Sequence, residues 1–229
     1  NRERALGYRG KFVEAIPHVR DEIIERMEAA ASCNGSRISV IEIGGTVGDF
    51  QNALFIEAAR VMKMRHPDDV LFVMVSYLPV PGTIGEMKTK PTQSAVRELN
   101  SNGVQPDFLI ARSTHALDDK RKEKLAIWCN IRPEHVISAP DITSIYEAPL
   151  NFEKDHLDDA LLDALRLPKK RKASLAVWKK FIAAATNTKV PEVHIAIVGK
   201  YFDTGDFIFS DAYLSVIEAI KFSAAKLRR

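Results

Sequence analysis

Residues 70–99, VLFVMVSYLPVPGTIGEMKTKPTQSAVREL, contain an apolar run, a polar loop and a helical pattern in direct succession. The run at 70–78 is rich in Val, Leu, Phe and Met, which is typical of a β-strand that is buried on both faces. Pro91 suits the first turn of a helix, because the N–H that proline lacks would have no partner there. A buried strand, a loop and then a helix form the repeating unit of a parallel sheet, so this stretch predicts an α/β fold.

The same alternation of strands and helices extends in both directions along the chain. Further strands are predicted at 38–45, 107–113 and 134–140, and helices over 14–31, 52–64, 118–130, 156–165 and 173–185. After the basic stretch PKKRK at 168–172, the run 193–199 predicts a strand that opens a second domain. Ligands of parallel α/β sheets bind at the carboxyl ends of the strands, so we expect the GGTVGD and KTKPTQ loops to meet there.

The composition excludes several classes of protein. The chain has 229 residues, of which 46% are hydrophobic and 28% charged, as in an ordinary globular protein. Its net charge of +3 does not indicate nucleic-acid binding. No apolar run reaches the roughly 18–20 residues that would cross a membrane. Cys33 and Cys129 show no paired spacing, so we expect reduced core thiols in a cytoplasmic protein, neither of them a nucleophile.

The stretch GEMKTKPTQ at 85–93 places two ammonium groups, two hydroxyls and an amide at the mouth of a helix. A helix start offers unpaired N–H groups and the positive end of the helix dipole, to which Lys88 and Lys90 add charge. A pair of solvated lysines is the default interpretation of such a sequence. The neighbouring Thr89, Thr92 and Gln93 shift the balance toward a polyphosphate site.

Two acidic residues near the first predicted strand have more than one interpretation. Glu42 lies within the apolar run VIEIGG, where an unpaired buried carboxylate would cost several kcal/mol, so it needs a partner. Mg²⁺ held with nucleotide phosphates and an ion pair with a nearby lysine or arginine are equally good partners on spacing alone. Asp49 could contact a ligand, but an N-cap for the helix that begins near Gln51 is favoured about two to one.

Two further basic residues are ambiguous by themselves. Lys124 belongs to a charged helix whose Leu117, Leu125 and Trp128 can face the core, which leaves Lys124 at the edge of that face. Spacing alone would make it ordinary surface charge. Arg112 ends a predicted strand, where loop ion pairs are common.

Four stretches together resemble the CTP synthase family. They are IEIGGTVGD, GEMKTKPTQ, VISAPDITSIYEAPL and VGKYFDTGDFIFSDAYLSVIEAI, and they occur in this order over nearly the whole chain. The resemblance implies a Rossmann-like amidoligase domain, related to P-loop NTPases, over 1–167. An interdomain linker over 168–192 and the start of a class I glutamine amidotransferase domain over 193–229 follow from it as well.

The same resemblance implies a reaction and its ligands. ATP phosphorylates O4 of UTP, and ammonia from L-glutamine then displaces this phosphate to give CTP. Mg²⁺ is the implied cofactor, CTP a feedback inhibitor, GTP an activator, and a homotetramer the full-length assembly. No membrane or nucleic-acid partner is implied.

Residue by residue, the resemblance assigns Mg²⁺ binding to Glu42 and places no catalytic residue of the glutaminase in this chain. The residues that it assigns to UTP or CTP are Asp49, Phe50, Gln51, Lys88, Thr89, Lys90, Pro91, Thr92, Gln93 and Lys124, and those for ATP are Arg112, Asp141 and Ile142.

The chain also departs from the family pattern. It contains no G-x-x-x-x-G-K-[ST] phosphate loop and no cysteine in a G-x-C-x-G context, so we expect an internal fragment that forms no CTP by itself. Gln51 replaces a carboxylate of the usual pattern, which puts the strength of CTP feedback in question. The loop 201–211 is longer than usual. Another α/β amidoligase, or a non-catalytic nucleotide-binding regulator, remain the alternatives.

Overall fold

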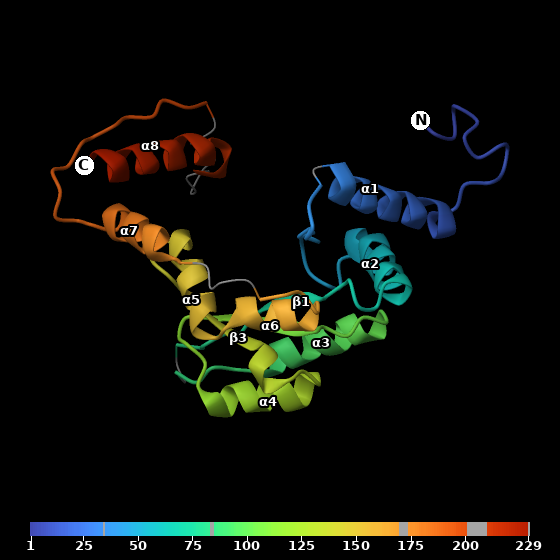
Figure 1. Ribbon diagram of the computed structural model, residues 1–229, viewed down its shortest axis with the longest axis horizontal. Helices are drawn as coiled ribbons and strands as arrows, with labels where there is room; N and C mark the ends of the chain where they lie inside the picture. The colour runs from blue at the N-terminus through green and yellow to red at the C-terminus, as the bar shows by residue number, and fades with distance from the viewer. Residues whose placement is uncertain (34, 83–84, 170–173, 201–209, 229) are drawn as a thin grey trace. The chain divides into compact units, whose positions relative to one another are not determined.

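The computed structural model describes residues 1–33, 35–82, 85–169, 174–200 and 210–228 (Figure 1). Its contacts divide the chain into two compact units. The first comprises Asn1–Asp141 and Asn151–Lys169, and the second comprises Ile142–Leu150 and Lys170–Arg229.

A three-stranded parallel sheet forms the centre of the first unit. Its strands β1 (Val73–Tyr77), β2 (Phe108–Ser113) and β3 (Val136–Pro140) are adjacent in the order of the sequence. Helix α3 (Lys90–Ser101) connects β1 to β2, and α4 (Asp119–Cys129) connects β2 to β3. The parallel α/β fold predicted from 70–99 is therefore confirmed.

Apolar side chains cover both faces of β2 and β3. On one face, α3 and α4 pack against the sheet through a core that includes Val96, Leu109 and Leu125. On the other face, α6 (Leu157–Ala164) contributes Leu157 to a smaller core around Phe108. Burial of both faces explains why residues 108–111, at the centre of this stretch, are all apolar.

The remaining elements of the first unit precede the sheet or join its strands. The π-helical turn η1 (Ala15–Val19) and α1 (Arg20–Cys33) come first, then η2 (Phe50–Asn52) and α2 (Ala53–Arg65), and η3 (Pro133–His135) leads into β3. Helices α1 and α2 pack together through Ile24, Ala58 and Val61. The predicted helices over 14–31 and 52–64 are thus confirmed.

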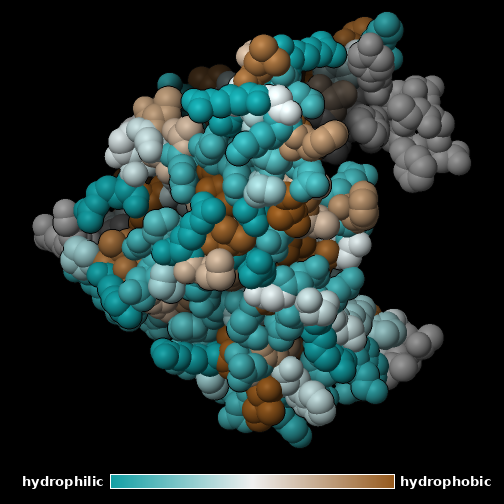
Figure 2. Space-filling model, turned by 90° about the vertical axis from the view of Figure 1, so that its right-hand side faces the viewer, coloured by the Kyte–Doolittle hydropathy of each residue, from teal (hydrophilic) through white to brown (hydrophobic). Residues whose placement is uncertain are grey.

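Two predicted strands are wrong, because neither 38–45 nor 193–199 forms a strand in the structure. A strand needs a neighbour that accepts and donates its backbone hydrogen bonds, and neither run pairs with a strand of the described part of the chain. Their apolar side chains are consequently exposed, up to 96% at Val40 and 98% at Val198. Brown apolar surface is visible among polar side chains on the face shown in Figure 2.

The second unit is built around an aromatic cluster. It contains η4 (Ile145–Glu147), α7 (Ala176–Ala185), η5 (Ser210–Tyr213) and α8 (Leu214–Leu227), while α5 (Ala148–Lys154) follows η4 directly. The ring of Tyr146 lies 5.4 Å from that of Phe181 and 5.2 Å from that of Phe222. Its hydroxyl donates to Glu218 at 2.5 Å, and the indole N–H of Trp178 donates to its carbonyl at 2.7 Å.

No helix in the described ranges combines the length and the apolar character that a membrane crossing requires. The unusual loop 201–211 falls almost entirely outside the described residues. The two cysteines differ from each other: Cys129 is buried as expected, whereas Cys33 is exposed and is therefore not a core thiol.

Candidate functional site

The carboxyl ends of the three strands lie at one edge of the sheet, and this edge carries most of the candidate residues. The chain leaves β1 through residues 78–89 into α3, and leaves β2 through residues 114–118 into α4. Both helices therefore begin at this edge, where their unpaired N–H groups favour an anion. The N–H of Leu78 donates to the carbonyl of Arg112 at 2.7 Å, so the loop after β1 is fixed to the end of β2.

Half of the KTKPTQ stretch is buried and serves the loop itself. Thr89, Thr92 and Gln93 are at most 6% exposed. The amide Nε2 of Gln93 donates to Oγ1 of Thr89 at 3.1 Å, and the hydroxyls of Thr92 and Ser76 lie 2.8 Å apart. The first of these hydrogen bonds stabilises the start of α3, and the second joins α3 to β1.

The other half of the stretch faces solvent. Pro91 lies in the first turn of α3, as predicted. Lys90 is exposed and forms no ion pair with any described residue. Lys88 is half-buried, and its Nζ donates to the carboxylate of Glu86 at 2.6 Å. The ammonium groups are thus the polar groups of KTKPTQ that reach solvent, and that of Lys88 is paired with Glu86.

Three basic side chains affect the carboxylate of Glu86, and Lys88 contacts it directly. The hydrogen bond from Lys88 and then its charge lower the pKa of the Glu86 carboxyl, and Arg121 and Lys124 on α4 add to the effect. Lys88 and Lys124, which are 36 positions apart in the sequence, therefore act on the same carboxylate. The resemblance assigned these two lysines to one triphosphate, and in the structure the charge of each lowers the pKa of the Glu86 carboxyl.

The first turn of helix α4 is capped by a side chain. The carboxylate of Asp118 accepts the N–H of Arg121 at 2.8 Å, which satisfies an otherwise unpaired donor. Leu125 faces the core as predicted, but Trp128 is 62% exposed, so its predicted core position is wrong. The buried face of α4 is centred on Leu125, Ala126 and Cys129, and Trp128 lies about 100° around the helix from that centre.

The GGTVGD loop is held by its own polar groups. The carboxylate of Asp49 accepts the N–H of Thr46 at 2.8 Å, which lowers the pKa of this carboxyl. Asp49 occupies the N-cap position of η2, as favoured from the sequence, but its side chain does not bond to that helix. The amide of Asn52 donates to the carbonyl of Gly44 at 2.6 Å. Gly45 has φ +83° and leaves no room for a Cβ beside Asp49.

The expectation that GGTVGD and KTKPTQ meet at the carboxyl edge is not met in the structure. A Cβ at Gly48 would overlap the carboxylate of Glu98, so this loop lies against the later part of α3. Glu98 is eight residues after Lys90, or about 12 Å along the helix. The difference follows from the absence of a strand at 38–45, since only a paired strand would deliver its loop to that edge.

The other predicted residues of the first loop lie in solvent. Phe50 is 94% exposed, and Gln51 is exposed beside it. Glu42 is also exposed, so the desolvation cost that seemed to demand a partner is absent. No group of three or more His, Cys, Asp or Glu side chains suited to a metal ion occurs among the described residues.

Arg112 and Asp141 lie at the ends of neighbouring strands. A guanidinium nitrogen of Arg112 is 3.5 Å from the carboxylate of Asp141, and both side chains are at least half exposed. The N–H of Asp141 donates to the carbonyl of Ser113 at 2.8 Å, which fixes the chain as it leaves β3. Ile142, the next residue, is partly buried. The pair presents a charged, open surface at the same edge as α3 and α4.

Residues 1–167 match the family model described as the CTP synthase N-terminus. The chain belongs to the CTP synthase family.

The CTP synthase of Methanocaldococcus jannaschii is 43% identical over 226 residues, which are 98% of this chain and 40% of that protein. The CTP synthase of Sulfolobus acidocaldarius is 41% identical over 228 residues, or 99% of this chain and 42% of the relative. That of Methanothermobacter thermautotrophicus is 38% identical over the whole chain and 42% of its own length. The chain thus spans about two-fifths of the CTP synthases that it matches.

Two residues beside the candidate CTP synthase site were missed by sequence reasoning. Arg121 lies one turn before Lys124 on α4, so helical spacing could have placed the two on one face. Glu86 precedes Lys88 by two positions, but no spacing rule indicates that the charges of a helix distant in sequence will act on a loop carboxylate. Only the structure shows the effect of Arg121 and Lys124 on Glu86.

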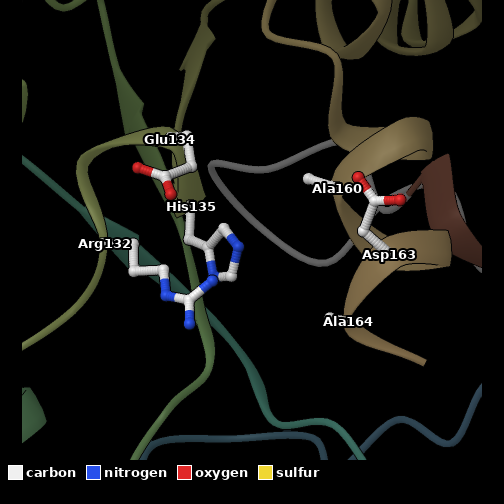
Figure 3. Close-up of a pocket in the computed structure, with 6 residues that line it drawn as sticks. All are labelled: Arg132, Glu134, His135, Ala160, Asp163 and Ala164. Carbon is white, nitrogen blue, oxygen red and sulfur yellow. The ribbon is translucent and has the colours of Figure 1, made fainter. Parts of the chain in front are cut away.

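A separate shallow pocket of about 190 Å³ lies away from the candidate residues (Figure 3). Arg132, Glu134 and His135 form one wall, and Ala160, Asp163 and Ala164 on α6 form the other. The ring of His135 stacks on that of Phe108, with the ring centres 4.0 Å apart. Phe108 begins β2, so this contact lies at the opposite end of the strands from the edge where α3 and α4 begin. The pocket lies where η3 packs beside α6.

Proposed function

We propose that this chain is an internal part of a longer CTP synthase, which aminates UTP to CTP with ATP and glutamine-derived ammonia. The observation that carries the proposal is the ion pair of Lys88 with Glu86 just before α3, together with the charges of Arg121 and Lys124 on α4, which act on the same carboxylate. Such a cluster suits the phosphates of a nucleoside triphosphate, because lysine supplies point charges and arginine planar donors. Family membership supports UTP, or CTP as its competitor, as the ligand of this cluster.

The residues of KTKPTQ then have two different roles. Lys88 and Lys90, with Lys124 from α4, hold the triphosphate through charge and hydrogen bonds. Thr89, Thr92 and Gln93 act on the ligand indirectly, since they fix the backbone whose N–H groups face the phosphates. This division follows from burial: the lysine side chains reach solvent and the other three do not.

We assign the neighbouring residues to the remaining ligands on the family pattern. Arg112, Asp141 and Ile142 lie at the ends of β2 and β3 or directly after them, and would line the adenine pocket for ATP. Phe50 and Gln51 would approach the pyrimidine ring, together with Asp49.

Glu42 fits Mg²⁺ by donor chemistry, because Mg²⁺ prefers carboxylate oxygen and completes its shell with water and phosphates. When bound, the ion would neutralise phosphate charge. The solvent-exposed position of Glu42 leaves its carboxylate oxygens free for such an ion.

The wider assignments belong to the same proposal. Residues 1–167 form the amidoligase part, 168–192 the linker, and 193–229 the start of the glutamine amidotransferase domain. L-glutamine is the ammonia source, GTP an activator, CTP a feedback inhibitor, and the full-length protein a cytoplasmic homotetramer.

The test compares two single-charge removals in the full-length protein. Lys90→Ala should weaken UTP and CTP binding about fivefold to tenfold, as expected for one exposed charge near a phosphate. Lys120→Ala removes the same charge from exposed α4 surface and should change the affinity less than about twofold. Isothermal titration gives the affinities, and CTP formation with ammonia gives the activity. Equal effects of the two variants, or an unaltered protein that binds neither nucleotide, would contradict the proposal.

A further inference from the structure

Glu86 is a carboxylate that pairs directly with Lys88, one of the candidate phosphate-binding lysines. Its Oε2 atom lies 2.6 Å from Nζ of Lys88, and the two side chains are 56% and 38% exposed. A negative group at this position opposes the binding of phosphates, because it occupies a donor that they need and repels their charge.

The other cations of the cluster are engaged differently. Arg121 is paired with Asp118 on its own helix, and Lys90 forms no ion pair with a described residue. Among the described residues, Lys88 is therefore the lysine of this cluster whose ammonium is paired with a carboxylate.

The backbone around Glu86 is fixed on its C-terminal side. Met87 is only 7% exposed within the main core, and the N–H of Lys88 donates to the carbonyl of Pro79 at 2.9 Å. The side chain of Glu86, by contrast, is more than half exposed. Rotation of that side chain alone can therefore release Lys88, without movement of the loop backbone.

We propose that Glu86 is a built-in competitor for the triphosphate: it holds Lys88 while the site is empty and yields this lysine when a nucleotide binds. The inference rests on the proposed function, because the competing ligand is the phosphate chain of UTP or CTP. It adds a residue that weakens affinity, and so sets the nucleotide concentration at which the site fills.

The test replaces Glu86 in the full-length protein and measures nucleotide affinity by isothermal titration. Glu86→Gln removes the charge but keeps the size, and should tighten UTP and CTP binding about threefold to tenfold at low salt. The gain should shrink as the salt concentration rises, because the groups involved are solvent-exposed. Uridine, which has no phosphates, should bind both forms equally.

Glu123→Gln is the matched control, because it removes one exposed carboxylate from α4 beside Lys124. It should alter UTP affinity less than about twofold. Unchanged or weaker UTP binding by Glu86→Gln would overturn the competitor role, and so would an equal gain in uridine affinity. If the unaltered protein binds UTP but fails these criteria, the inference alone is lost. If it binds neither UTP nor CTP, the proposed function fails as well.

Discussion

The replacement Thr92→Val separates the buried and exposed halves of KTKPTQ. Thr92 is fully buried, and its hydroxyl lies 2.8 Å from that of Ser76 on β1. Valine keeps the branched shape, so the main loss is this hydrogen bond, which is worth about 0.5–1.5 kcal/mol. Ser76 is only partly buried, so its hydroxyl can bond to water in the variant. We therefore expect Thr92→Val to lower the free energy of unfolding by about 1 kcal/mol.

The assay is hydrogen exchange of the α3 and β1 amides in the full-length protein. A loss of about 1 kcal/mol should speed local exchange about fivefold, while UTP affinity changes less than about twofold. Lys90→Ala should show the reverse pattern, with weaker UTP binding and unchanged exchange. Ser76→Ala is the companion variant, because it removes the same hydrogen bond from the β1 side and leaves Thr92 in place.

The opposite result would refute this division of roles. If Thr92→Val weakens UTP binding as much as Lys90→Ala does and leaves exchange in α3 unchanged, the Thr92 hydroxyl faces the ligand rather than β1.

Two further predictions concern other parts of the chain. Burial raises the pKa of the Cys129 thiol from 9.0 to about 11, so its thiolate at pH 8 is about 100-fold scarcer than that of an unshifted thiol. A thiol reagent should therefore modify exposed Cys33 in the native protein and Cys129 only on unfolding, and equal labelling rates of the two would contradict this prediction. Because the pKa is raised in the folded state, the stability that Cys129 contributes should fall as pH rises from about 9 toward about 11. Tyr146→Phe removes the hydrogen bond that lowers the pKa of Glu218 together with Lys221, so this pKa should rise toward 4.5. NMR titration of Glu218 checks the shift, with Lys221→Ala as the comparison, and an unchanged pKa in Tyr146→Phe would show that the phenol does not bond to it.

Local signals predicted the central sheet well. The apolar residues 108–111 of β2, Pro91 at the start of α3 and the charged stretch that forms α4 each report on nearby residues, and each element formed where it was expected. The runs 38–45 and 193–199 carry an equally strong local signal. They failed because strand formation depends on a partner, and the sequence of a run does not contain its partner.

The candidate site shows the same limit. Residue type indicated that the KTKPTQ lysines suit phosphates, and family resemblance added Lys124. Neither could show that Thr92 and Gln93 turn inward, because helical position alone does not tell which polar side chains find partners in the core. Neither found Glu86, whose role depends on which helix lies opposite.

The boundary between the two compact units does not follow the order of the sequence. The chain passes from the first unit to the second at Ile142, returns at Asn151, and leaves again at Lys170. Tyr146, near the middle of the short first visit, provides the ring that α7 and α8 pack around.

A chimera cut once, in the basic stretch at 168–172, would therefore separate these helices from their own aromatic centre. A transplantable cassette has to carry residues 142–150 as well. Conversely, a chain nicked by trypsin in that stretch should keep its two pieces associated, because the earlier piece still supplies Tyr146. The two pieces of such a nicked chain would behave as complementing fragments of the second unit.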